Sequence, residues 1–312
     1  MTITSQQNIR RDAIIQYPRF KEIQHDIDRC QRMSPRFGEA QCIALDGPPG
    51  AGKTTIAKTL ANAFPEVETK DGWRIPVLYL EMPSPATIKT VSTLALYRLK
   101  DPLAEKGTIG SMNLRLVGLI KGCGVKLIIL DDFHHLIDTE TNRILAKVSD
   151  WLKVLIKETG VPVMVVGIEG KVDLILHANS QLSRLFAIRR KLEPFKWDPK
   201  KPGTIQEFAR FVEYAEQTIS MRFSTELRRT ELLYRMYYAT DGIVNNIMNL
   251  IRYAEVFAEE RGIKTMTLDL LALAFDERLA QHLPHKVNPF TVPTTDRFIA
   301  PTPPPKHRQG RA

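Results

Sequence analysis

With 312 residues, 43% of them hydrophobic and 25% charged, the chain has the size and composition of a soluble globular protein of one large or two modest domains. No apolar stretch approaches the roughly 20 residues that cross a bilayer, the N-terminus lacks a signal-like apolar segment, and the three cysteines form no CxxC pair. These features argue against a membrane protein or a disulfide scaffold and predict a cytoplasmic protein, while the net charge of +9 fits either a polyanionic partner or a solvated surface.

Four segments follow one another along the chain. Residues 1–40 are polar, with a broken apolar stripe that predicts a helical segment. Residues 41–200 alternate helix-length segments with five strand-like runs: CIALD, IPVLYLE, VKLIILD, VPVMVVG and AIRRKLEPF. Because parallel strands need long crossovers, this pattern predicts an α/β core with a parallel five-stranded sheet covered by helices on both faces. Residues 201–283 predict a small all-helical domain, and the proline-rich, basic residues 284–312 predict a disordered tail or linker.

The strongest chemical signal is GPPGAGKT, residues 47–54, which matches G-x-x-x-x-G-K-[ST] at every fixed position. It lies between a predicted strand and a predicted helix, so its glycines can turn backbone amides toward phosphate oxygens at a helix N-terminus. Lys53 can reach the β- and γ-phosphates, and the Thr54 hydroxyl can ligate Mg²⁺. The predicted nucleotide-binding residues are Gly47, Pro48, Pro49, Gly50, Ala51, Gly52, Lys53, Thr54 and Thr55.

The segment LIILDDFHHL, residues 127–136, could be a metal centre or the end of a buried strand that serves the nucleotide. A phosphate-binding loop needs a carboxylate at a neighbouring strand end to orient Mg²⁺, and Asp131 has that position. Asp132 falls where many such ATPases have a glutamate that polarises the attacking water. His134 and His135 are expected to point in different directions, and no second cluster offers ligands to a transition metal. We therefore interpret the segment as a Walker B motif.

These motifs, followed by a helical domain, resemble the AAA+ ATPases, and within them the TniB/TnsC family of bacterial transposition regulators. The resemblance covers roughly residues 40–280. VPVMVVGIEG, QLSRLFAIRRKLEPF and TDGIVNNIMNLIRYAEVFAEERGIKTMTLDLL are similar to the family's sensor strand, its LNRF segment and its lid. KGCGV, directly before the Walker B strand, resembles the TnsC proteins of CRISPR-associated transposons.

The resemblance implies a protein that binds ATP and Mg²⁺, forms a ring or helical filament around double-stranded DNA and recruits or activates a transposase. A targeting adaptor of the TniQ type is a further implied partner. Arg184 matches the family's arginine finger, which reaches the ATP of a neighbouring subunit and stabilises charge on its γ-phosphate. Arg189 and Arg190 compete for this role, and Arg184 could instead be a surface or helix-capping residue.

Three departures from the family pattern predict slow hydrolysis. Asp132 is one methylene shorter than the usual glutamate. Ile168 stands where the family has a polar sensor and cannot bind a water or a phosphate. No arginine follows the glycine of DGIVNNIMN at the spacing that other AAA+ lids use.

The basic stretch between the second strand and the Walker B motif is the predicted DNA surface. Its candidates for sequence-independent phosphate contacts are Lys106, Thr108, Arg115 and Lys121, although ordinary solvated helix charges would look the same. The apolar residues between these charges are expected in the core: Leu114, Leu116, Val117, Leu119 and Ile120.

Two other function classes share these motifs. One is a AAA+ replication initiator or loader, which usually carries an appended winged-helix domain for which the short tail leaves no room. The other is a protein-binding signalling switch ATPase.

Overall fold

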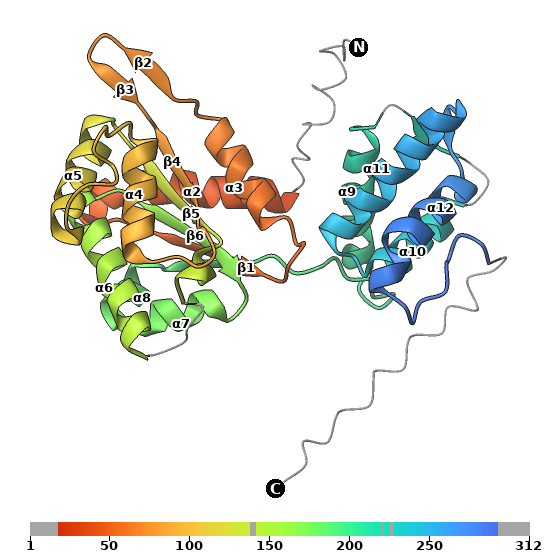
Figure 1. The fold of residues 1–312 in the computed structure, drawn as a ribbon. Coiled ribbons are helices and arrows are strands. Elements are labelled where there is room, and N and C mark those ends of the chain that lie inside the picture. Colours follow the sequence, from red (N-terminus) through yellow and green to blue (C-terminus); the bar gives the residue numbers. More distant parts are fainter. Residues whose placement is uncertain (1–17, 138–141, 220, 225–227, 293–312) are drawn as a thin grey trace, which may run out of the picture. The chain divides into compact units, whose positions relative to one another are not determined.

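The computed structural model describes residues 18–137, 142–219, 221–224 and 228–292. The chain divides between residues 193 and 194 into two compact units, an α/β unit and a helical unit (Figure 1). Each unit has its own hydrophobic core, so each is described by itself.

The α/β unit is built on a five-stranded sheet in the order β4-β5-β6-β1-β7, and every pair of neighbouring strands is parallel. The strands are β1 (Ile43–Gly47), β4 (Val77–Glu81), β5 (Leu127–Asp131), β6 (Val163–Ile168) and β7 (Ile188–Lys191). The predicted parallel five-stranded sheet is thereby confirmed. Since β1, β5 and β6 are central, their carboxyl ends bring the P-loop, the Walker B residues and Ile168 to one edge of the sheet.

Helices cover both faces of this sheet, which explains why its central strands are continuous apolar runs. One face packs against a core built with α4, α5, α6, α7 and α8, while α2 contacts β1 and α3 contacts the central strands. The helices are α2 (Pro18–Phe37), α3 (Lys53–Asn62), α4 (Ile88–Arg98), α5 (Ile109–Gly122), α6 (Asn142–Thr159), α7 (Lys171–His177) and α8 (Ser180–Leu185).

Two features of this unit differ from the prediction. An exposed antiparallel hairpin, β2 (Val67–Thr69) and β3 (Gly72–Arg74), connects α3 to β4 and has no counterpart among the predicted strands. On α5, Leu116 is buried as expected, but Leu114 is 79% exposed, so its predicted place in the core is wrong. The buried residues of α5 recur every four positions, and Leu114 lies on the other side of the helix.

The helical unit contains α9 (Pro202–Glu216), α10 (Arg229–Thr240), α11 (Val244–Arg261), α12 (Leu268–Arg278) and the short 3-10 helix η2 (Ala280–His282). A two-residue parallel pairing of β8 (Arg222–Phe223) with β9 (Thr265–Met266) is added to the predicted helices. Phe195, before the first helix, is buried in this unit, and its amide donates to the Gly242 carbonyl at 2.9 Å. The structure therefore groups residues 194–200, predicted as the end of the α/β core, with the helical unit.

Residues 284–292 pack against α10, whereas the sequence predicted that a disordered tail begins at residue 284. The Lys286 ammonium, 3% exposed, donates to the Tyr238 carbonyl and the Asp241 carboxylate. The Arg235 guanidinium donates to the carbonyls of Pro289 and Val292. We call residues 284–292 the strap. These contacts of Arg235 and Lys286 differ from the disordered tail that the sequence predicted from residue 284. The rest of the predicted tail, residues 293–312, lies outside the described residues.

Among the described segments, no helix combines the length and the apolar character that crossing a bilayer requires.

Candidate nucleotide-binding site

The loop between β1 and α3 has the backbone that phosphate binding requires. Gly52 immediately precedes α3 and has φ 92°, in the left-handed region that favours glycine. Gly47 has φ 155°, and a Cβ at this position would lie 2.4 Å from the Leu192 carbonyl oxygen, so only glycine fits beside the chain that follows β7. The first amides of α3 lack intrahelical partners and are available to an anion at this end of the loop.

Lys53 lies inside this loop and is only 8% exposed. Its ammonium donates to the carbonyls of Gly47 at 2.9 Å and Pro48 at 2.8 Å. Burial lowers the pKa of Lys53 from its ordinary value, and nearby carboxylates, that of Asp132 above all, act in the opposite direction. The lysine is thus a point charge held where the phosphates of a nucleotide would be bound.

Asp131 ends β5 and is completely buried. One carboxylate oxygen accepts the Tyr79 hydroxyl at 2.9 Å, and the other accepts the Asp132 amide at 2.9 Å. Burial raises the pKa of Asp131, while hydrogen bonds from the hydroxyls of Tyr79 and Thr54 lower it. The structure therefore places the Thr54 hydroxyl beside the Asp131 carboxylate.

A hydroxyl beside a carboxylate is an oxygen donor set that suits Mg²⁺, which usually binds one or two carboxylates together with substrate phosphates. Within the part of the chain that is described, no group of three or more His, Cys, Asp or Glu side chains could hold a metal ion by itself. The donor set thus fits an ion that the nucleotide helps to bind.

Asp132 follows the strand with φ 51°, a left-handed conformation that aspartate tolerates better than most residues. Among the carboxylates that raise the pKa of Lys53, that of Asp132 has the largest effect. The next residues form the 3-10 helix η1 (Phe133–Ile137), in which the rings of His134 and His135 lie 4.3 Å apart. The expectation that these two histidines point in different directions is therefore wrong.

Ile168, at the end of β6, pairs with Gly47 in the sheet register. An alkyl side chain thus stands beside the P-loop where the family pattern has a polar sensor. Glu169 follows Ile168: its amide donates to the Gly47 carbonyl at 3.3 Å, and its carboxylate binds the Lys191 ammonium at 2.6 Å.

Tyr79 and Glu169 are residues that sequence reasoning missed. The available signal for Tyr79 was a hydroxyl-bearing residue inside the apolar run IPVLYLE, two positions before the strand ends. Only the strand register, which pairs Glu81 with Asp131, explains why the Tyr79 hydroxyl can reach the Walker B carboxylate.

The three competing arginines differ in what they contact. Arg190 forms two hydrogen bonds to the buried carboxylate of Asp26, at 2.6 and 3.2 Å, and Arg189 binds several groups around α7 and α8. Arg184 is exposed at the last turn of α8, and its guanidinium has no hydrogen-bond or ion-pair partner among the described residues. Of the three, Arg184 is the one whose guanidinium is available to another molecule.

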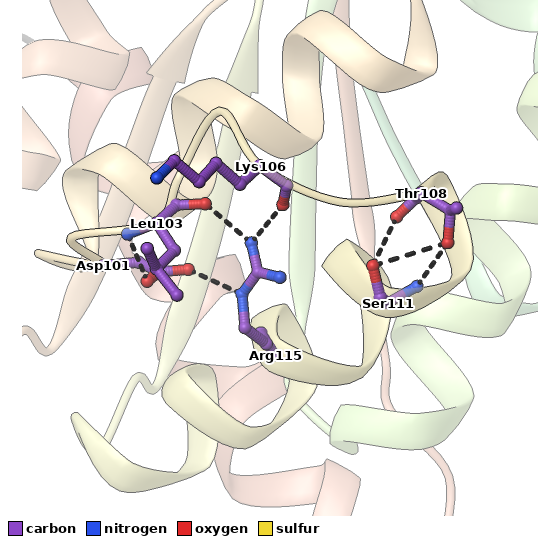
Figure 2. Close-up of polar contacts among 6 residues, drawn as sticks. All are labelled: Asp101, Leu103, Lys106, Thr108, Ser111 and Arg115. Atoms are coloured by element: carbon purple, nitrogen blue, oxygen red, sulfur yellow. Dashed lines mark hydrogen bonds and ion pairs between the residues drawn. The ribbon is translucent and has the colours of Figure 1, made fainter.

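The four predicted DNA-binding residues also differ in whether their polar groups already have partners within the protein. The Arg115 guanidinium donates to the Asp101 carboxylate at 2.9 Å and to the carbonyls of Leu103 at 2.8 Å and Lys106 at 2.9 Å. Figure 2 shows that Arg115 thereby braces the loop before α5, and that the Lys106 ammonium takes no part in these contacts. The Thr108 hydroxyl caps α5 by accepting the Ser111 amide at 3.3 Å.

Lys106 and Lys121 are exposed, and neither has a partner for its ammonium among the residues that the structure describes. Arg115 and Thr108 use their polar groups to shape the loop, whereas the two lysines leave theirs free for a ligand.

A family model described as "Bacterial TniB protein" matches residues 5–197, more than half of the chain. The chain belongs to the TniB family. The membership predicted from the motifs is confirmed, while the finer resemblance of this TniB protein to TnsC of CRISPR-associated transposons stays a prediction. No curated protein sequence matches it.

Among solved structures, the TniB protein resembles the Aeropyrum pernix ORC2 protein in its ADPNP–ADP complexes, with a TM-score of 0.59, 16% identity, and coverage of 86% of this chain and 70% of that one. The Aeropyrum pernix ORC1 protein in complex with DNA has a TM-score of 0.56 and 15% identity, with coverage of 85% of this chain and 66% of that one. Cdc6p from Pyrobaculum aerophilum has a TM-score of 0.54 and 15% identity, with coverage of 76% of this chain and 60% of that one. At these identities the likeness shows the fold, which is that of the AAA+ P-loop ATPases.

Proposed function

We propose that this TniB protein is an ATP-dependent regulator of DNA transposition, which assembles on double-stranded target DNA and recruits or activates a transposase. The observation that carries the proposal is the arrangement of Lys53, Thr54 and Asp131 around one loop in a member of this family. It joins a phosphate-binding backbone to a magnesium-compatible donor pair on a AAA+ core.

Each residue of the site has a role in this proposal. The backbone amides of residues 47–55 cradle the phosphates, and Lys53 neutralises the β- and γ-phosphates. Thr54 and Asp131 would hold Mg²⁺, which would polarise the phosphoryl oxygens. Asp132 orients and activates the attacking water, and Arg184 stabilises the γ-phosphate of a neighbouring subunit.

Hydrolysis is slow in this proposal. The short carboxylate of Asp132 and the alkyl side chain of Ile168 give the attacking water fewer ligands than a glutamate and a polar sensor would. A long-lived ATP state suits a regulator whose assembly on DNA must persist until its partner arrives.

DNA binding in the proposal uses the exposed lysines, Lys106 and Lys121, and is indifferent to sequence because lysines of this kind contact phosphates. The braced loop sets the position of Lys106, and Thr108 sets the start of α5. The net charge of +9 is compatible with such a partner.

The segments KGCGV and QLSRLFAIRRKLEPF support partners of the TnsC kind, namely a transposase and a targeting adaptor of the TniQ type. We propose these as the protein partners and a ring or helical filament as the assembly. The ORC and Cdc6p structures share the fold at 15–16% identity and give no reason to prefer a replication loader.

Electron microscopy of the purified protein with duplex DNA tests the proposal. We expect rings or helical filaments only when DNA and a slowly hydrolysed ATP analogue are both present. Lys53→Ala removes the phosphate-binding charge and should abolish them, whereas Lys70→Ala, in the exposed loop between β2 and β3, should leave them intact. Assemblies that form equally well without nucleotide, or with Lys53→Ala, contradict the proposal. ATP hydrolysis unaffected by DNA would favour the signalling switch instead.

A further inference from the structure

The guanidinium of Arg189, the second residue of β7, contacts the chain on both sides of Arg184. Its Nη2 donates to the Ser183 hydroxyl at 2.8 Å, and its Nε donates to the Phe186 carbonyl at 3.4 Å. Ser183 immediately precedes Arg184, and Phe186 is the C-cap residue that follows α8. A single planar group therefore spans the short stretch of backbone that carries Arg184.

The same guanidinium ties this stretch to α7. Nη1 donates to the Asp173 carboxylate at 2.7 Å, and the Nε2 atom of His177 lies 3.2 Å from it. Arginine suits this task because its donors lie in a rigid fork, whereas lysine offers a single flexible point charge. The result is a clamp, formed by Arg189 with Ser183, Phe186, Asp173 and His177, that joins α7, α8 and β7.

We expect the clamp to contribute little to the stability of this part of the unit. The side chains of the Asp173–Arg189 ion pair are 43% and 34% exposed, and exposed pairs contribute little to stability. The apolar residues beneath them are almost completely buried and hold the two helices on the core; they are Val172, Ile175, Leu176, Leu182, Leu185 and Phe186. What these residues do not fix is the direction of the exposed Arg184 side chain.

We infer that Arg189 is a positioning residue, which fixes the backbone around Arg184 so that this finger reaches the ATP of the next subunit in a productive geometry. The inference rests on the proposed function, in which Arg184 acts between subunits. A group that stabilises a transition state must be held within about 0.5 Å of its productive place. A misplacement on the order of 1 Å costs roughly 10²-fold in rate.

The test measures kcat and KM for ATP in assemblies on DNA, together with ATP affinity and thermal unfolding of the free protein. Arg189→Ala should lower kcat on the order of 10²-fold. ATP affinity, KM and the unfolding temperature should stay close to wild type, and Arg189→Lys should not restore kcat. Lys153→Ala, which removes an exposed ion pair of α6 outside the clamp, is the control and should behave as wild type.

Ser183 supplies a second pair of variants. Ser183→Ala removes one acceptor of the clamp and should lower kcat, whereas Ser183→Thr keeps the hydroxyl and should retain it. This pair keeps the test decisive even if Arg189→Ala folds poorly.

Mixed assemblies show on which side of the subunit boundary Arg189 acts. Subunits with Arg189→Ala keep an intact ATP site, and subunits with Asp132→Asn keep an intact Arg184. Mixing the two should give more hydrolysis than either variant alone, because some sites then combine both intact halves. No recovery on mixing, or wild-type kcat in Arg189→Ala and Ser183→Ala, overturns the inference.

The variant Arg184→Ala separates this failure from failure of the proposed function. If Arg184→Ala lowers kcat on the order of 10³-fold while Arg189→Ala does not, only the clamp is wrong. If Arg184→Ala turns over normally on DNA, the finger itself is misassigned, and both its role in the proposed function and the role of the clamp are wrong.

Discussion

The substitution Tyr79→Phe isolates one hydrogen bond of the proposed magnesium site. The Tyr79 hydroxyl donates to the Asp131 carboxylate at 2.9 Å, and phenylalanine removes the donor while leaving the ring in place. Asp131 is completely buried, so no water replaces the lost donor from the solvent side. The carboxylate then keeps fewer of the contacts that orient it toward Mg²⁺.

The expected size of the effect follows from that geometry. A hydrogen bond to a charged group contributes about 1.5–3 kcal/mol, which corresponds to roughly 10–150-fold in an equilibrium constant. Partners that orient a metal ligand typically change metal affinity by about 10–100-fold when they are lost. We therefore expect the Mg²⁺ concentration at half-maximal ATP binding to rise by about 10–100-fold.

The assay is a Mg²⁺ titration of the binding of a fluorescent ATP analogue, with thermal unfolding measured in parallel. Tyr97→Phe is the matched control, because Tyr97 is 69% exposed on α4 and its hydroxyl has no hydrogen-bond partner among the described residues. If both variants have the wild-type midpoint for Mg²⁺, the Tyr79 hydroxyl does not support the site and the reasoning is refuted. A large loss of thermal stability in Tyr79→Phe would assign the contact to folding instead.

The remaining predictions concern hydrolysis, DNA binding and the strap. Asp132→Glu should accelerate single-turnover hydrolysis by roughly 10²-fold, since it moves the carboxylate toward the attacking water; a variant no faster than wild type shows that the short side chain is not the brake. Lys121→Glu should weaken binding to all duplexes alike and reduce its salt dependence, whereas Arg115→Ala should weaken binding without the full change in salt slope, because its guanidinium braces a loop. DNA affinity is measured by fluorescence anisotropy over a range of salt concentrations. If both variants change the salt dependence of DNA affinity equally, Arg115 contacts phosphate as the sequence predicted. A chain ending at Leu283 should unfold at lower temperature than one ending at Val292, because it leaves a buried arginine of α10 without two of its acceptors; equal unfolding temperatures would contradict this.

The parts of the molecule that the sequence predicted well are those governed by local pattern. The P-loop needs glycines, a lysine and a hydroxyl at fixed spacing, and this requirement is visible in eight consecutive residues. The central strands are visible because burial on both faces demands an uninterrupted apolar run. Asp131 follows from the same logic, as the first carboxylate after such a run.

The parts that escaped prediction depend on contacts between distant segments. The hairpin of β2 and β3 has three residues per strand and an exposed surface, so it leaves no periodic signal. A basic residue such as Arg115 looks the same in sequence whether it binds a phosphate or braces a loop. The strap is proline-rich and aperiodic, and its contacts are with α10, about 50 residues earlier in the chain: the Arg235 guanidinium binds strap carbonyls, and the strap's own Lys286 binds the Tyr238 carbonyl.

The uncommitted guanidinium of Arg184 has a consequence for any assembly that this chain forms. If the finger completes the ATP site of a neighbour, each subunit carries halves of two different sites. An open filament then has unequal ends: one terminal subunit holds ATP that no finger reaches, and the other offers a finger with no ATP to meet. A closed ring has no such ends, so every site in it is complete. Growth and loss of subunits would therefore differ between the two ends of a filament. The position of the finger and the ATP site on each subunit would determine the direction in which the filament grows along DNA.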